Sequence, residues 1–359
     1  MRILVVTGAS GGHIFPAQAI IESLRNRQGI EIMLVLPKRS SIKIEGVAVR
    51  YIATTPFTLS INLRSVVNVF NFLKACLQSL FLLQEFKPDV IVGFGTIDSV
   101  PIVTLAWLAR IRILIHEQNV IPGRATRLLI NFSDIIALSF PQTQDYLRRG
   151  RNRITVTGNP LRSKLKVMSK KEALDFFGFK ESYFTILVVG GSQSSHNLNM
   201  LFINSAMRLE RNLMLQVIHI CGSKDYSLLQ ESYGNFRWQV KLFQFLDQMH
   251  YAYSASDLVV SRAGATTIAE IIYFAKPAIL VPYPYAYRHQ SANARLFQKA
   301  GCCLMIEEGR RAEEELTEGI LALLNAPEKL HKMHCSFSGF SKTNAAENLV
   351  EEVLRLGKN

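Results

Sequence analysis

Two stretches of the sequence share one plan, in which an apolar strand, a glycine-rich turn and the start of a helix follow one another. The first is "VVTGASGGH" at residues 5–13 and the second is "VVGGSQSSHN" at residues 188–197. After each, apolar runs of strand length alternate with helix-length amphipathic stretches. Near-continuous Val, Ile and Leu runs are typical of parallel strands buried on both faces, and the alternation predicts right-handed βαβ units. Because 359 residues suffice for two cores, we expect an α/β protein with two Rossmann-like parallel-sheet domains.

The predicted strands fall into two series. The first series covers residues 2–7, 31–36, 89–93, 111–116, 134–139 and 153–157. The second series covers residues 184–190, 214–221, 240–245, 257–261, 277–282 and 302–306. The segment "TGNPLRSK" lies between them, so we expect one domain over residues 1–160 and a second over residues 161–340. Residues 341–359 carry apolar side chains on one helical face, and we expect this helix to dock near the domain junction.

One long stretch interrupts the alternation. "SVVNVFNFLKACLQSLFLLQEF" at residues 65–86 is apolar nearly all round, with Lys74 as its only charge before Glu85. A membrane-spanning helix needs about 20 such residues, but Lys74 and the asparagines would be costly at mid-bilayer. The composition therefore favours a buried or partly interfacial helix over a span. Arg64 and Lys87 flank the stretch, as basic residues flank helices that lie on a membrane surface.

The positive charge is concentrated in the first half of the chain. Of the net charge of +13, residues 1–163 carry +10, from 19 Lys and Arg against 9 Asp and Glu. Such a basic region predicts an anionic partner. Aromatic and basic residues do not interleave, which argues against nucleic acid. The favoured partners are an anionic membrane surface and a phosphorylated substrate.

The start of the chain and the cysteines indicate the compartment. Met1 runs directly into a strand-like segment without the pattern of an export signal. The five cysteines show no metal-ligand spacing. We therefore expect a cytoplasmic protein with reduced thiols.

The first glycine-rich turn has the composition of an anion site. Such a turn directs backbone N–H groups and a helix N-terminus to one point, and Gly11 and Gly12 let a phosphate approach closely. A dinucleotide fingerprint would need glycine where Ser10 stands, and an acid after the second strand, where Lys38 and Arg39 stand. An NADP enzyme is therefore disfavoured, although these two basic residues would suit a 2′-phosphate.

The second half of the chain carries the pieces of a sugar-nucleotide site. "SRAGATTIAEI" at residues 261–271 combines a strand end, a glycine turn and a helix start with Glu270, whose carboxylate can accept hydrogen bonds from both hydroxyls of a ribose. "HQSANA" opens another helix, with Gln290 and Asn293 on one face, where their amides suit sugar hydroxyls. Together with a diphosphate on the turn at Ser192, these residues predict a nucleotide-sugar site.

Six ordered motifs resemble those of the MurG family of UDP-N-acetylglucosamine transferases. They are "GASGGHIFPA", "IHEQNVIPGRATR", "GNPLR", "GGSQSSHNLN", "SRAGATTIAEI" and "HQSANA". The resemblance implies a GT-B glycosyltransferase, whose two Rossmann-like domains face each other across a cleft. It implies inverting transfer of N-acetylglucosamine (GlcNAc) from UDP-GlcNAc to the muramyl sugar of undecaprenyl-diphosphate-linked MurNAc-pentapeptide in peptidoglycan synthesis. It also implies a peripheral protein at the cytoplasmic face of the bacterial inner membrane.

Carried over position by position, the resemblance implies roles for single residues. His13 matches the family's candidate general base, which titrates near working pH, and Glu117 is a second candidate. The implied substrate contacts are Ser10, Gly11, Gly12, Asn119, Arg162, Ser192, Leu246, Ala265, Thr266, Thr267, Ile268, Ala269, Glu270, Gln290 and Asn293. The family is thought to hold the diphosphate of the acceptor at the first glycine turn.

The loop after the third predicted strand departs from the family pattern. The family motif G-x-G-G-Y-x-S-G-P reads "GFGTIDSVP" here, so Thr96, Ile97 and Val100 replace Gly, Tyr and Gly. Thr96 and Val100 narrow any loop that holds a phosphate, and Ile97 removes a hydroxyl. We therefore expect the donor half of the site to match the family better than the acceptor half.

No cofactor and no metal site are expected. The sequence has no Asp-x-Asp motif that could clamp a metal–diphosphate pair. Stimulation by Mg²⁺ without a dedicated protein site stays open.

Other functions also stay open at this point. Another GT-B enzyme with a different acceptor, or a UDP-GlcNAc 2-epimerase, would share the donor half. The epimerase would interconvert free UDP-sugars and release no lipid product. An idle membrane-associated scaffold would share the fold but would not need His13, Ser192, Glu270 and Gln290.

Overall fold

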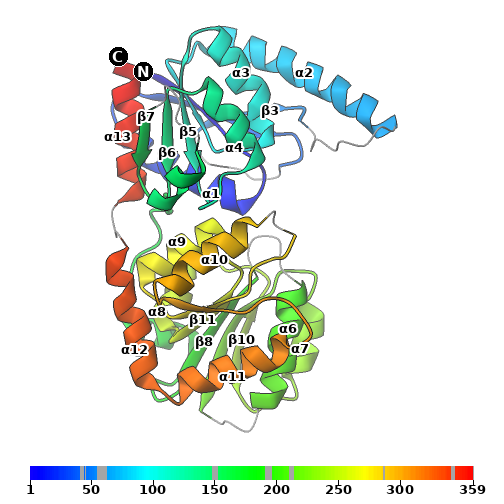
Figure 1. The fold of residues 1–359 in the computed structure, drawn as a ribbon, viewed down its shortest axis with the longest axis vertical. Helices are drawn as coiled ribbons and strands as arrows, with labels where there is room; N and C mark the ends of the chain where they lie inside the picture. The colour runs from blue at the N-terminus through cyan, green and yellow to red at the C-terminus, as the bar shows by residue number, and fades with distance from the viewer. Residues whose placement is uncertain are drawn as a thin grey trace. The chain divides into compact units, whose positions relative to one another are not determined.

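The computed structural model divides the chain into two compact units (Figure 1). Unit 1 comprises Met1–Arg162 with Thr343–Asn359, and unit 2 comprises Ser163–Lys342. The structure describes residues 1–40, 44, 46–54, 63–147, 153–190, 196–209, 214–285, 288–340 and 344–358, with side chains from residue 68 onward in the helix that begins at residue 63. Each unit is built on its own parallel sheet.

Unit 1 has a seven-stranded sheet with the order β3-β2-β1-β4-β5-β6-β7. Its strands are β1 (Arg2–Val6), β2 (Glu31–Pro37), β3 (Ala48–Ile52), β4 (Val90–Gly93), β5 (Arg112–Glu117), β6 (Ile135–Leu138) and β7 (Arg153–Val156). At its centre, Val5 of β1 pairs with Leu34 of β2 and with Val92 of β4. Because every pairing is parallel, the carboxyl ends of the strands share one edge, and the loops at this edge carry the predicted site residues of unit 1.

Helices cover both faces of this sheet. They are α1 (Gly11–Arg25), α2 (Leu63–Phe86), α3 (Val100–Leu108), α4 (Arg124–Leu129) and α13 (Ala345–Lys358), with short 3₁₀ turns η1 (Ile97–Ser99), η2 (Ile130–Phe132) and η3 (Pro141–Tyr146). Ile3 and Val5 of β1 pack in one core cluster with α1 and α13. Leu4 and Val6 pack in another with α2 and α3. The alternation of β1 side chains thus fills a core on each face of the sheet.

The C-terminal helix α13 belongs to unit 1. Leu349, Val350 and Val353 are fully buried in the same cluster as the apolar face of α1. An ion pair of 2.6 Å joins Arg27, just after α1, to Glu347. The amphipathic face expected from the sequence is therefore used within unit 1, and docking near the domain junction stays a prediction.

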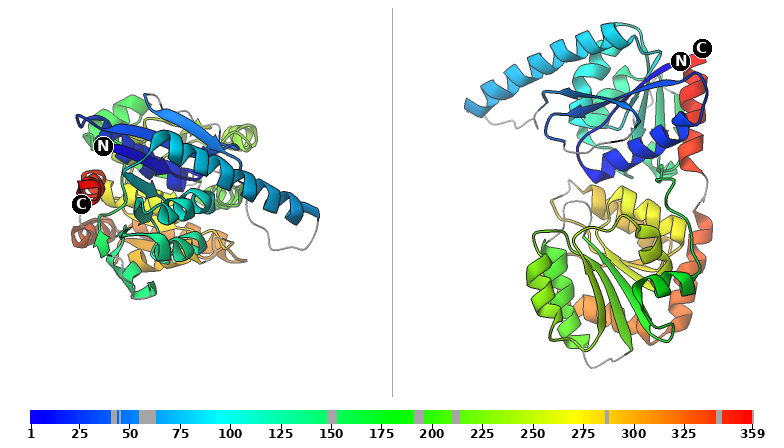
Figure 2. Two further views of the ribbon diagram at one scale, coloured as in Figure 1. Left: turned by 90° about the horizontal axis from the view of Figure 1, so that it is seen from above. Right: turned by 180° about the vertical axis from the view of Figure 1, so that it is seen from behind.

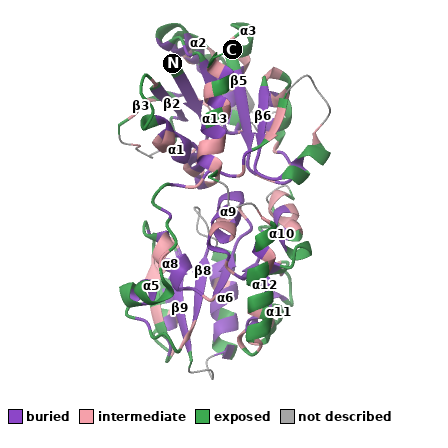
Figure 3. Ribbon diagram, turned by 90° about the vertical axis from the view of Figure 1, so that its left-hand side faces the viewer, coloured by how far each residue is buried: buried purple, intermediate pink, exposed green. Residues whose placement is uncertain are grey.

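Unit 2 has a six-stranded sheet with the order β10-β9-β8-β11-β12-β13. Its strands are β8 (Phe184–Val189), β9 (Leu215–Ile220), β10 (Gln239–Phe243), β11 (Leu258–Ser261), β12 (Ala278–Leu280) and β13 (Cys303–Met305). Its helices are α5 (Lys170–Phe177), α6 (His196–Leu209), α7 (Tyr226–Tyr233), α8 (Met249–Ala255), α9 (Ala265–Phe274), α10 (His289–Lys299), α11 (Ala312–Leu324) and α12 (Pro327–Ser336), followed by the turn η4 (Phe337–Gly339). The strands are mostly buried while the outer faces of the helices are exposed (Figure 3).

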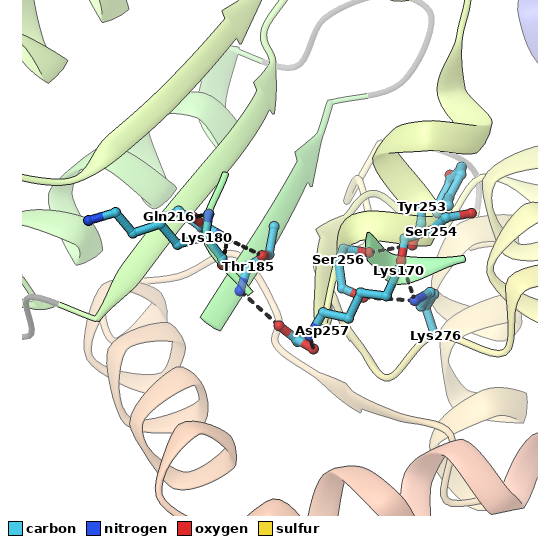
Figure 4. A network of polar contacts seen from close by, with 9 residues as sticks. All are labelled: Lys170, Lys180, Thr185, Gln216, Tyr253, Ser254, Ser256, Asp257 and Lys276. Carbon is cyan, nitrogen blue, oxygen red and sulfur yellow. Dashed lines mark hydrogen bonds and ion pairs between the residues drawn. The ribbon is translucent and has the colours of Figure 1, made fainter. Parts of the chain in front are cut away.

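A polar network stabilises the amino edge of the unit 2 sheet (Figure 4). Asp257, just before β11, accepts hydrogen bonds from the Thr185 backbone N–H at 2.9 Å and from Lys170 Nζ at 2.5 Å. Lys276, just before β12, donates from Nζ to the carbonyls of Ser254 and Ser256 at 3.2 and 2.8 Å. These carbonyls end helix α8, so the network ties a helix terminus to two strand starts.

The structure confirms all twelve strands expected from the sequence and adds one, β3. The long apolar stretch is the 24-residue helix α2, which extends beyond the sheet of unit 1 (Figure 2). Within the described ranges, no helix has the length and apolarity needed to cross a membrane.

Candidate active site

The loop between β1 and α1 places the N-terminus of a 15-residue helix at the carboxyl edge of the unit 1 sheet. Ser10 precedes the helix in extended conformation, and its carbonyl accepts hydrogen bonds from the backbone N–H groups of His13 and Ile14, both at 3.0 Å. A Cβ built on Gly12 would meet nothing within 4 Å, so the helix start has room for a ligand there. The turn has the backbone geometry that the predicted anion site requires.

His13 lies in the first turn of α1 and is half-buried. Burial lowers the pKa of His13 from its ordinary 6.5, while the charge of Glu117, polar contacts with the Phe94 backbone and the Gln118 side chain, and the charge of Asp98 oppose this shift. The net lowering keeps the imidazole neutral at pH 7, which is the form that a general base needs. The two carboxylates would stabilise the imidazolium formed when the ring takes up a proton.

Glu117, the second candidate base, ends β5 and is buried. Its Oε1 accepts hydrogen bonds from the Asn119 backbone N–H at 2.9 Å and from Asn119 Nδ2 at 3.2 Å, and its Oε2 accepts one from the Gly123 backbone N–H at 3.0 Å. These three donors hold the loop between β5 and α4 in place. The same contacts fix Asn119, a predicted substrate contact, beside the carboxylate.

The loop that departs from the family pattern contains a buried carboxylate, Asp98, which forms an ion pair with the exposed Arg39. Asp98 accepts from Arg39 Nη2 and from Thr54 Oγ1, both at 2.5 Å. A Cβ on Gly8, in the β1 turn, would lie 3.0 Å from Thr96 Cγ2 and 3.3 Å from Asp98 Oδ2, so the altered loop lies directly against the first glycine turn. Arg39, considered above for a 2′-phosphate, is thus held by a carboxylate of its own chain, which further disfavours that interpretation.

Arg162 lies at the end of unit 1, and its side chain is mostly buried. The guanidinium carbon lies 4.5 Å from the centroid of the Phe15 ring on α1, within range for a cation–π contact. This contact places the Arg162 guanidinium beside the helix that carries His13. Arg162 therefore lies in unit 1, as do Ser10, Gly11, Gly12 and Asn119, which the resemblance also assigns to the nucleotide sugar.

In unit 2, the turn after β11 leads through Gly264 into α9, which begins at Ala265. The predicted run from Ala265 to Glu270 forms the first turns of this helix and is buried except for Thr267. Glu270 accepts a hydrogen bond from the Tyr253 hydroxyl on α8 at 2.8 Å. A carboxylate is thus fixed near a helix start, as the ribose prediction requires.

The two predicted amides on α10 have different environments. Gln290 Oε1 accepts a hydrogen bond from the Tyr283 backbone N–H at 2.9 Å in an exposed setting. Asn293 is fully buried, and its Nδ2 donates to the Ala263 carbonyl at 3.1 Å. Asn293 thus ties α10 to the turn before α9, and its contact with a sugar stays a prediction. Leu246 is buried, and Ser192 lies outside the described residues.

Sequence reasoning missed Arg262 and Glu308. The Arg262 guanidinium is buried, forms an ion pair with Glu308, and donates from Nη1 to the Val281 carbonyl at 3.0 Å. These contacts join the loops after β11, β12 and β13 at the carboxyl edge of the unit 2 sheet. The only sequence signal was an arginine directly before the glycine turn, and its partner Glu308 lies 46 residues further along the chain.

Two parallel-sheet domains, each with a glycine turn that leads into a helix at its carboxyl edge, are typical of two-domain nucleotide-sugar enzymes, glycosyltransferases among them. Residues 3–138 match the glycosyltransferase family 28 N-terminal domain, and residues 185–352 match the glycosyltransferase family 28 C-terminal domain. The chain belongs to the family of UDP-N-acetylglucosamine–N-acetylmuramyl-(pentapeptide) pyrophosphoryl-undecaprenol N-acetylglucosamine transferases, the MurG family.

Relatives over the full length support this assignment. The chain is 35% identical to the transferase of that name from Halothermothrix orenii, over 99% of this chain and 100% of the relative. It is 31% identical to the one from Listeria monocytogenes, over 100% of both chains. Among solved structures, Acinetobacter baumannii MurG matches with a TM-score of 0.78, 23% identity and 99% of both chains covered. A UDP-GlcNAc 2-epimerase from Neisseria meningitidis matches with a TM-score of 0.72 and 17% identity, over 99% of this chain and 100% of that one, which shows a shared GT-B fold.

Proposed function

We propose that this protein transfers GlcNAc from UDP-GlcNAc to the muramyl sugar of undecaprenyl-diphosphate-linked MurNAc-pentapeptide, with inversion at the anomeric carbon. The supporting observation is that one chain carries both a helix-start carboxylate, Glu270 held by Tyr253, and a neutral histidine, His13, at a second helix start. The first suits the ribose of a UDP-sugar, and the second suits removal of a hydroxyl proton. Full-length relatives at 31–35% identity bear the name of this transferase.

The chemistry divides between the two units. In unit 1, His13 takes the proton of the attacking muramyl hydroxyl as the new bond to the anomeric carbon forms, an effect worth about 10²–10⁴-fold in rate. His13 is a better candidate than Glu117, because three N–H donors of its own loop already occupy the Glu117 carboxylate. In unit 2, Glu270 holds the ribose, and Gln290 contacts the sugar.

The departing UDP must be stabilised as its bond to the sugar breaks. Arg162 and the N-terminus of α9 supply positive charge for this diphosphate. Displacement from the face opposite the leaving group turns an α-linked donor into a β-linked product. No step of this scheme needs a metal held by the protein, and Mg²⁺ would act only by screening the diphosphate.

The exposed face of α2 has the apolar composition that suits a membrane-docking surface. Phe70, Leu73, Leu77 and Phe81 recur at spacings of three and four residues and are 56–69% exposed, so they form one apolar stripe on the helix. Large exposed apolar patches mark interaction sites. We therefore propose that the protein is peripheral at the cytoplasmic face of the bacterial inner membrane, where anionic lipids would attract the basic first half of the chain.

The decisive test mixes the purified full-length protein with radiolabelled UDP-GlcNAc and lipid-linked muramyl-pentapeptide. Transfer of label into the lipid phase, with release of UDP, is the expected result. If the label stays in the aqueous phase and free UDP-sugars interconvert, the protein is an epimerase. If neither occurs while UDP-GlcNAc still binds, the scaffold alternative holds.

A further inference from the structure

A buried chain of hydrogen bonds runs beside His13 in unit 1. Gln118, just after β5, donates from Nε2 to the His116 carbonyl at 2.9 Å and lies 3.0 Å from His116 Nδ1. The other ring nitrogen, His116 Nε2, lies 3.0 Å from the Gly158 carbonyl. His116 and Gln118 are 0 and 1% exposed, so water cannot replace these contacts.

The chemistry of the donors and acceptors determines the direction of each of these hydrogen bonds. A carbonyl oxygen only accepts, so His116 Nε2 must carry the proton that it donates to Gly158. Burial lowers the pKa of His116 to about 4, so the ring is neutral and its Nδ1 is an acceptor. The Gln118 amide must therefore turn its NH₂ group toward His116, where both N–H bonds find acceptors.

The same constraint fixes the other end of the Gln118 side chain. Its Oε1 is buried and has no hydrogen-bond partner of good geometry among the described residues, and the same holds for His13 Nδ1. The Gln118 side chain already acts on the His13 ring, whose pKa it raises. The Phe94 backbone acts on the same ring. Gln118 Oε1 and His13 Nδ1 are both buried, and each is costly to leave unpaired, so a hydrogen bond between them would satisfy both groups.

We propose that Gln118 is the positioning residue of the reaction: its Oε1 accepts the Nδ1 proton of His13 and so leaves Nε2 as the nitrogen that takes the substrate proton. The inference rests on the proposed function of His13 as the base. His116 acts one step further out, because it prevents the amide from turning over. The proton of the muramyl hydroxyl moves to Nε2, the hydroxyl oxygen bonds to the anomeric carbon, and UDP leaves with the electron pair of the broken bond.

The charges around the ring favour the protonated state. Glu117 and Asp98 raise the pKa of His13, and His116 stays neutral. Arg39, which pairs with Asp98, offsets part of that charge. The charged neighbours therefore influence the pKa of His13, while Gln118 orients its ring, as the partner of a histidine does in other proton-transfer sites.

The first experiment determines the tautomer of the His13 ring and does not depend on an activity assay. ¹⁵N shifts of the His13 ring in the full-length protein, identified by difference from His13→Asn among the eight histidines, are expected to show a protonated Nδ1 and a bare Nε2 at neutral pH. In Gln118→Leu the ring is expected to populate the other tautomer. A bare Nδ1 in the wild type, or no change in the variant, would overturn the proposal, whether or not the protein proves to be a transferase.

The second experiment reads catalysis. Gln118→Leu is expected to lower kcat about 10- to 100-fold, within the range for a misplaced general base, with the KM for UDP-GlcNAc unchanged. Gln118→Glu is expected to raise the pH of the ascending limb of the rate profile by about one unit, since a carboxylate beside an imidazole raises its pKa. The control Gln142→Leu changes an exposed glutamine of η3 and is expected to leave both readouts unchanged. Equal effects of Gln118→Leu in the wild type and in His13→Ala would contradict a role that acts through His13.

Discussion

The Tyr253 hydroxyl on α8 donates to the Glu270 carboxylate on α9 at 2.8 Å, and both side chains are buried. This bond fixes the carboxylate that we assign to the ribose. Tyr253 also stacks on Phe274 at a centroid distance of 5.0 Å, so the ring stays in place when the hydroxyl is removed. The Tyr253 hydroxyl therefore orients the Glu270 carboxylate, while the Tyr253 ring packs the helix.

Tyr253→Phe is expected to weaken binding of UDP-GlcNAc about tenfold, since a hydrogen bond to a charged group is worth about 1.5–3 kcal/mol. The melting temperature should change little, because the stacked ring remains. Calorimetric titration of UDP-GlcNAc measures the effect. Tyr251→Phe removes a hydroxyl from the same helix without touching Glu270 and serves as the control. Unchanged affinity in Tyr253→Phe would show that the pair does not serve the donor.

The pH dependence of turnover should follow His13. Burial outweighs the raising effects of Glu117, Asp98 and their neighbours, so the pKa lies below 6.5. A base works when deprotonated, so kcat/KM for the acceptor is expected to be flat near pH 7 and to fall with acid only below pH 6.5. His13→Ala should lose about 100-fold or more in kcat and also lose this limb. The exposed His331 of α12 provides the control variant His331→Ala. A loss below tenfold in His13→Ala would exclude it as the base.

The strands of this fold were open to prediction from sequence because buried parallel strands are continuous apolar runs. β3 escaped because it is an edge strand, "AVRYI", with Arg50 and Tyr51 exposed and only Ile52 fully buried. Such a strand has no continuous apolar run, and its pairing with β2 depends on the tertiary fold.

The candidate site, like the strands, was predictable from sequence only in part. Glycine turns and helix starts are local, so the positions of His13 and Glu270 followed from short motifs. The partners of Asp98 did not, because Arg39 lies 59 residues away. The inward position of Asn293 was also hidden, since helical spacing shows which residues share a face but not what that face contacts. The direction of the Gln118 amide depends on a carbonyl that only the fold brings near.

The apolar stripe on α2 should control membrane binding. The double variant Phe70→Ser and Phe81→Ser removes two rings that are 69% and 67% exposed. Each ring buried in lipid is worth about 1.5–3 kcal/mol, so binding to anionic vesicles at low salt is expected to fall at least tenfold, as measured by co-sedimentation. Met207→Ser with Leu228→Ser removes two exposed side chains of unit 2 and should bind as the wild type does. Equal binding of both double variants would exclude α2 as the docking surface.

Turnover should survive removal of divalent metal. Across the part of the chain that the structure describes, no group of three or more His, Cys, Asp and Glu side chains could hold a metal ion. We expect the protein to retain at least about a tenth of its activity after exhaustive EDTA treatment, since Arg162 and helix dipoles stabilise the leaving diphosphate. Complete loss of transfer that Mg²⁺ restores at stoichiometric concentration would indicate a dedicated site instead.

Lys276 should make the stability of unit 2 depend on alkaline pH. Burial lowers the pKa of Lys276 from 10.5 to about 8, with Asp257 opposing and Lys170 adding to the shift. Between pH 8 and 10.5 the unfolded chain therefore binds more protons at this residue than the folded protein does, so stability from Lys276 rises with pH across this range. The difference in free energy of unfolding between wild type and Lys276→Met, from urea titrations, is expected to favour the wild type more at pH 10 than at pH 7. The exposed neighbour of Lys170 on α5, Lys171, gives the control Lys171→Met, whose difference from the wild type should not vary with pH. A Lys276→Met difference that is also independent of pH would show that Lys276 keeps its ordinary pKa and acts only through its two carbonyl contacts.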